Sequence, residues 1–261
     1  MTPAARERLQ VRVPMLLMSA AAWMLLVIDP RGMALHAHHS TTVPGAPPSS
    51  VSFEMLMAHN PPASLAAGWT LMLVAMMLPL VIAPVRHIRD RSFPRRRGRA
   101  ILLFVASYAA VWMAAGVVMF ALALTVRLVA PQSFVPVALM TVVALVWQFS
   151  PAKQRCLNRG HAHPELAAFG SAADIDALRF GWTHGVWCVG SCWALMLLPM
   201  LMSRGHMAAM AAVSLCMFAE RLDRPMPPRW RLRGVNKAAR IAVAQTRMLL
   251  QIRPVNRPAS R

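Results

Sequence analysis

Acidic side chains are scarce in this sequence. Only nine of its 261 residues are Asp or Glu, while hydrophobic residues make up 57% and charged residues 14%. A soluble domain of this size needs more charge and alternating polar faces to cover its surface. The composition therefore argues against a soluble globular protein. It also leaves too few carboxylates in the apolar segments for paired-carboxylate catalysis.

Common catalytic motifs are missing as well. The sequence has no phosphate-binding loop, no convincing nucleophile and base set, and no Cys-x-x-Cys pair, because three residues separate Cys188 from Cys192. A non-enzymatic protein is therefore favoured. A membrane thiol oxidoreductase stays open as the enzymatic alternative.

Long uncharged runs dominate what is present. Most of them reach the roughly 17 to 25 residues that a helix needs to cross about 30 Å of hydrocarbon. They cover residues 13–28, 65–85, 100–126, 128–149, 180–203 and 205–219. The sequence therefore predicts an all-α fold, a polytopic transmembrane helix bundle of about six spans.

The basic residues are concentrated in every second connection between the predicted spans and at the two ends of the chain. Of the 28 Lys and Arg residues, 25 lie before the first span, in alternate connections or after Glu220, which leaves Arg31, Arg127 and Arg204. The positive-inside rule then predicts that both termini are cytoplasmic. The predicted regions are a cytoplasmic N-terminus (1–12), an outer loop (29–64), a five-span membrane domain (65–220) with a cytoplasmic loop (150–179), and a basic cytoplasmic tail (221–261).

Two features of the ends stay open. Residues 6–34 have a basic start, an apolar middle and small residues after it, so the first span can instead be a cleaved signal peptide. The basic tail is expected to lie against anionic lipid headgroups, not on nucleic acid, because nothing else in the chain resembles a nucleic-acid reader. The lipid bilayer and other membrane proteins are thus the expected partners.

Sulfur and imidazole side chains recur at helical spacing in the fifth span. His184, Cys188, Cys192 and Met196 follow one another at intervals of four residues. Any three in a row share one face of a helix, because four residues make one turn plus about 40°. Thiolates and thioethers favour thiophilic ions such as Cu(I). The pattern predicts a metal site centred on Cys188 and Cys192.

A tight turn at residues 203–205 predicts that spans five and six form an antiparallel hairpin. Cys192 and Cys216 each lie twelve residues from Arg204, so both are expected at one depth. Zn(II) would instead take a tetrahedral set of Cys156, Cys188, Cys192 and either His184 or Cys216. The competing interpretation is that these cysteines and methionines only fill space in the helix packing.

Weaker candidate ligands lie outside the spans. His161 and His163 follow Cys156 in the cytoplasmic loop, and the outer loop adds His36, His38, His39, Met55, Met57 and His59. Imidazole and thioether groups on an outer loop suit copper capture.

Several of these residues together carry a resemblance. The segments 69–79, Cys156-Leu157, Gly185-Val-Trp-Cys-Val-Gly-Ser-Cys-Trp-Ala-Leu-Met196 and Ala219-Glu220 resemble the DUF2182 family of integral membrane proteins described as predicted metal-binding. The resemblance covers most of residues 65–223 and implies a multi-span protein of the bacterial inner membrane with a cysteine-based site. Two positions depart from the family pattern, because Gly160 and Ser191 stand where cysteines are usual.

The function predicted from the sequence is the handling of a thiophilic ion, Cu(I) before Zn(II), at the cytoplasmic end of the hairpin. The alternative is a non-catalytic membrane scaffold or assembly partner.

Overall fold

The computed structural model describes residues 3–28, 61–130, 133–202 and 205–231. This described part is helical and contains no strand. The helices are α1 (Pro3–Ile28), α3 (Pro62–Arg91), α4 (Arg97–Val129), α5 (Val135–Phe149), α6 (Pro151–Gly160), α7 (Gly170–Leu201) and α8 (His206–Arg221). The predicted all-α fold is confirmed.

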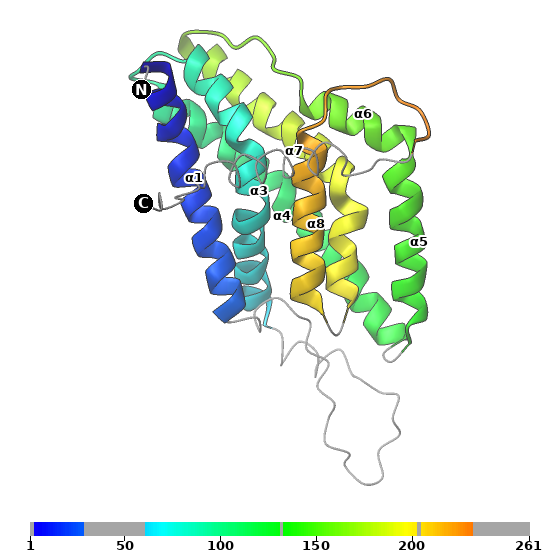
Figure 1. Cartoon of the computed structure of the whole chain (residues 1–261). Helices are drawn as coiled ribbons and strands as arrows, with labels where there is room; N and C mark the ends of the chain where they lie inside the picture. The colour runs from blue at the N-terminus through cyan, green and yellow to red at the C-terminus, as the bar shows by residue number, and fades with distance from the viewer. Residues whose placement is uncertain (1–2, 29–60, 131–132, 203–204, 232–261) are drawn as a thin grey trace, which may run out of the picture.

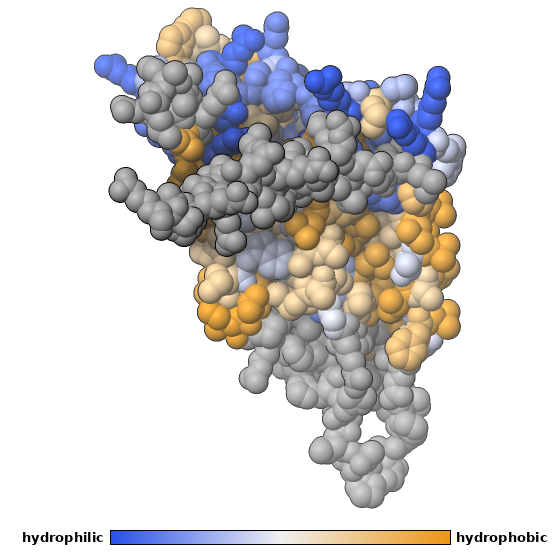
Figure 2. Space-filling view, in the orientation of Figure 1, coloured by the Kyte–Doolittle hydropathy of each residue, from blue (hydrophilic) through white to orange (hydrophobic). Residues whose placement is uncertain are grey.

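The long helices run side by side as one bundle, with α6 lying across one end (Figure 1). Helix α4 packs along α7, and α1 packs along α3. The end of the bundle that carries α6, the starts of α4 and α7 and the ends of α3 and α8 is called the basic end. Hydrophilic side chains gather at this end, and on the face shown apolar side chains cover the rest of the described bundle (Figure 2).

Four helices of the described part are long and apolar enough to cross a membrane, namely α1, α3, α4 and α7. A fifth is possible if α5 and α6, which meet at a bend of 63°, count as one span. Helix α8 has 16 residues, or about 24 Å at about 1.5 Å per residue, which is short for a crossing. The structure thus gives four or five membrane-length elements where the sequence predicted about six.

Glycine allows close contacts between these helices. The Trp69 indole donates to the carbonyl oxygen of Trp112 at 3.0 Å and lies where a Cβ on Gly116 would be. On the other side of α4, a Cβ on Gly181 would overlap the carbonyl oxygen of Phe104 and the hydroxyl of Ser107. The registry of α4 on α7 therefore depends on Gly181.

A buried polar cluster joins α5, α6 and α8 at the basic end. The ammonium of Lys153, which is 0% exposed, lies 2.8 Å from the carboxylate of Glu220. The side-chain amide of Gln148 contacts both groups. A buried charge requires a partner of opposite sign, and here the pair also fixes the position of α8.

We expect Gly181→Ala to destabilise the bundle by about 1 to 3 kcal/mol, because the added methyl group meets backbone that cannot move aside. Gly98→Ala is the matched control, since nothing lies within 4 Å of its Cβ position. Thermal unfolding of the purified protein in detergent measures both. Equal stability of the two variants would contradict the close approach of α4 and α7.

We expect Lys153→Met to destabilise the protein by about 3 to 5 kcal/mol, because it leaves the Glu220 carboxylate buried without its cation. The double variant Lys153→Met, Glu220→Gln removes both charges and should recover much of that loss. The same unfolding measurement tests this. A double variant less stable than Lys153→Met alone would show that the ion pair is not the source of the effect.

Candidate metal centre

Cys188 and Cys192 lie one turn apart on α7 and are buried, with exposures of 1% and 2%. Both are free thiols. The Cys192 thiol donates to the carbonyl oxygen of Cys188 at 2.9 Å, and the hydroxyl of Ser191 donates to the same oxygen at 2.8 Å. Two soft donor atoms are thus held next to each other inside the bundle.

A side chain from α4 completes the contacts of the first thiol. The phenol of Tyr108 is buried and donates to the sulfur of Cys188 at 3.3 Å. Tyr108 is the single tyrosine of the chain, and a buried phenol needs a hydrogen-bond partner. A hydrogen bond to sulfur stabilises the thiolate form that binds metal.

His184 lies one turn before Cys188 on α7 and is 3% exposed. Its ring is surrounded by Phe104, Tyr108 and Phe180, with ring centroids 6.0, 5.9 and 5.9 Å away. The structure therefore brings His184 and the two thiols to one face of α7, as the four-residue spacing predicted.

Arg221, the last residue of α8, lies beside this face. Its Nη2 is 3.5 Å from Nε2 of His184. Its guanidinium also occupies the space that a Cβ on Gly160 would take, and the neighbouring His184 is one helical turn from Cys188. A cation is thus placed next to the thiol pair.

The structure separates the other two cysteines from this pair. Cys156 is on α6, and its sulfur lies against Gly190, on the side of α7 about 200° around the helix from Cys188. Cys216 lies 3.8 Å from the amide nitrogen of Gln148 on α5. Met196 continues the face one turn beyond Cys192 and is 1% exposed.

The expectation that Cys156 and Cys216 join the pair is therefore not met in this geometry. In the part of the chain that the structure describes, no group of three or more His, Cys, Asp or Glu side chains is arranged to hold a metal ion. A site at this position has to be built on the two thiols, with Met196 and His184 one turn away on either side.

The weaker candidates differ in position. Both nitrogens of His161 face carbonyl oxygens, those of Leu157 at 2.8 Å and Arg221 at 3.3 Å. The ring of His163 packs 4.9 Å from that of His87, and partial burial together with the nearby His87 charge lowers the pKa of His163. The outer-loop candidates His36, His38, His39, Met55, Met57 and His59 lie outside the described residues.

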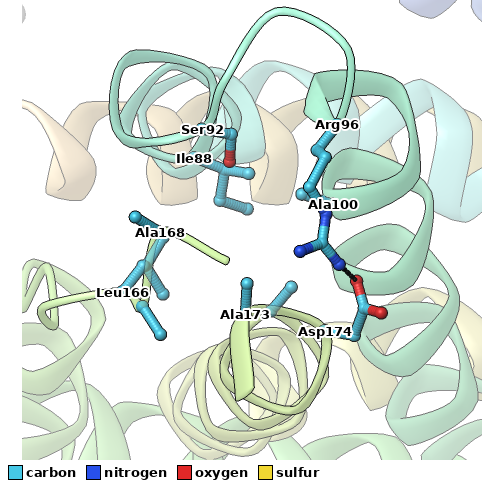
Figure 3. A pocket seen from close by; sticks show the side chains of 10 residues that line it. Ile88, Ser92, Arg96, Ala100, Leu166, Ala168, Ala173 and Asp174 are labelled. Carbon is cyan, nitrogen blue, oxygen red and sulfur yellow. Dashed lines mark hydrogen bonds and ion pairs between the residues drawn. The ribbon is translucent and has the colours of Figure 1, made fainter. Parts of the chain in front are cut away.

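A small pocket at the basic end lies between the end of α3, the start of α4 and the start of α7 (Figure 3), and neither Cys188 nor Cys192 lines it. Arg96 and Asp174 close one side of it with an ion pair of 2.9 Å, and Arg99 binds the same carboxylate at 2.8 Å. None of the side chains that line it carries sulfur or imidazole. These ion pairs hold the start of α4 to the start of α7. The pocket itself offers no ligand for a soft ion.

Sequence reasoning missed Tyr108 and Arg221. The sequence contained a clue to Tyr108, because the hydroxyl of a single tyrosine in an apolar span needs a hydrogen-bond partner inside the bundle. It contained none to Arg221, because Arg221 begins a run of basic residues that the sequence assigns to a cytoplasmic tail.

A family model matches most of the chain that contains this site. It covers residues 66–243 and describes the PpoB2 family as a copper chaperone. This is not the DUF2182 family that the sequence analysis named, and the agreement between the two lies in the link to metal binding. No curated protein and no solved structure matches the chain. Because the match spans more than half of the sequence, the chain belongs to the PpoB2 family of copper chaperones.

Proposed function

We propose that this protein is a membrane-embedded copper chaperone that holds Cu(I) between Cys188 and Cys192. The observation that carries the proposal is a pair of buried, free thiols one turn apart, inside the segment that the copper chaperone family model matches. Thiolate sulfur is a preferred ligand of Cu(I). Nothing in the family description supports zinc.

The surroundings of the pair suit this ion. Cu(I) accepts two thiolates without further ligands, so the two cysteines suffice, and the thioether of Met196 can add a third contact. The imidazole of His184 can do so only if its Nε2 lone pair turns from Arg221 to the ion. The Tyr108 hydroxyl donates to Cys188 and orients its sulfur. Burial excludes water and oxidants from the ion, which protects the Cu(I) state.

The proposed location is the bacterial inner membrane, with the site toward the cytoplasm. Four membrane-length helices support a membrane protein, and Arg221, at the end of α8, lies beside His184, one turn from Cys188. Basic residues mark the cytoplasmic side of spanning helices. Anionic lipid headgroups are then the neighbours of the basic end.

A chaperone role requires a partner protein that gives or receives the ion, and it requires no catalysis. Exchange of Cu(I) between thiol pairs proceeds by ligand substitution, so no oxidant or reductant is consumed. The alternative function is a scaffold in which the cysteines only fill space in the helix packing. The burial of Cys188 and Cys192 is equally consistent with that alternative.

Metal analysis separates these two functions. We expect the full-length protein, purified anaerobically in detergent and exposed to Cu(I), to retain about one equivalent of copper. The variant Cys188→Ser, Cys192→Ser should retain none. The matched control is Cys156→Ser, Cys216→Ser, which removes the two thiols that lie apart from the pair and should bind copper like the wild type.

Two results would contradict the copper function at this site. One is a wild-type protein that binds no copper while its unfolding temperature is normal, which favours the scaffold. The other is copper that persists in Cys188→Ser, Cys192→Ser and disappears in the control variant, which moves the site to other cysteines.

A further inference from the structure

Arg221 is a cation that forms no ion pair with a carboxylate in the described part of the chain. The ion pairs of the described residues leave it out, because the neighbouring carboxylate, Glu220, binds Lys153. Its guanidinium lies 3.5 Å from Nε2 of His184, one turn before Cys188, and fills the space that a Cβ on Gly160 would take. Arginine stays protonated in proteins, so this positive charge is permanent.

The other charged and titratable groups near the thiols do not cancel this charge. Lys153 and Glu220 neutralise each other. The Nε2 atom of His184 faces a guanidinium, which can only donate, so this nitrogen carries a lone pair. His161, whose Nε2 lies 3.3 Å from the backbone carbonyl oxygen of Arg221, and His163 are neutral or cationic side chains, so neither can cancel the charge of Arg221. The metal site thus has one excess positive charge.

We propose that Arg221 makes the thiol pair selective for a monovalent soft cation over a divalent one. This inference rests on the proposed function of Cys188 and Cys192. When the two thiols bind a metal ion they lose two protons to solvent, so a Cu(I) complex carries one negative charge and a Zn(II) complex carries none.

The charge of Arg221 then acts differently on the two complexes. Beside Cu(I) bound by two thiolates, the guanidinium neutralises the negative charge and the buried site has no net charge. Beside Zn(II) bound in the same way, the positive charge has nothing to attract. Charges in a buried site are costly unless paired, so the arrangement favours Cu(I).

The glycine at position 160 leaves room for this cation. With glycine at position 160, the space beside this part of α6 is filled by the guanidinium of Arg221 in place of a side chain on α6. A further thiolate there would add negative charge and favour a divalent ion. The guanidinium thus occupies space that a side chain at position 160 would otherwise take.

The test is the ratio of Cu(I) to Zn(II) affinity in the full-length protein, measured anaerobically by competition with a chelator for each ion. We expect Arg221→Met to lower Cu(I) affinity about tenfold or more, as loss of an outer-shell partner typically does, and to leave Zn(II) affinity unchanged or raised. Arg221→Lys keeps the charge and should keep most of the selectivity. Arg224→Met is the control, since this exposed arginine lies beyond the helix end.

The ratio of Cu(I) to Zn(II) affinity does not depend on the fraction of misfolded protein in a sample. Arg221→Gln provides a second variant without the positive charge. Equal changes for both ions, or no change in the neutral variants, would overturn the selectivity role while leaving copper binding intact. Absence of copper binding in the wild type would overturn the proposed function and this inference together.

Discussion

The packing of α4 along α7 is the constraint on which the proposed site depends. It buries the face of α7 that carries His184, Cys188 and Cys192, and it brings the Tyr108 hydroxyl to the Cys188 sulfur. The contact is close because Gly181 has no side chain to hold the two backbones apart. Without this packing the thiols would face lipid or solvent, where they would be oxidised or left without orienting partners.

The charged side chains at the end of α8 include one neutral ion pair and one cation outside it. Lys153 and Glu220 form a closed pair that ties α6 to α8 and contributes no net charge. Arg221, the next residue along α8, forms no such ion pair within the described residues and lies against the face proposed to bind metal. One helix end therefore provides both a structural cross-link and the cation that we assign to ion selectivity.

The local part of the site followed from the sequence, and the tertiary part did not. Spacing of four residues places Cys188 and Cys192 on one face of a helix whatever surrounds it. Counting residues from the turn at Arg204 predicted only that Cys192 and Cys216 lie at the same distance along the hairpin. Whether the two thiols face each other depends on the rotation of α8 about its own axis. In the structure this rotation places the Cys216 sulfur next to Gln148 of α5.

The number of spans shows the same limit. Hydropathy predicted helix in the run at residues 128–149, but α4 continues to Val129 and α5 begins only at Val135, which leaves a helix of 15 residues that bends into α6. Composition shows where apolar chain occurs, whereas helix ends depend on local caps and prolines such as Pro136 and Pro151.

X-ray absorption at the copper edge on the Cu(I)-loaded, full-length protein tests the central claim most directly. Our account predicts two sulfur neighbours of the copper ion, both supplied by α7 and lost in Cys188→Ser, Cys192→Ser. A copper ion surrounded only by nitrogen and oxygen, or a sulfur signal that persists in that variant, would contradict it.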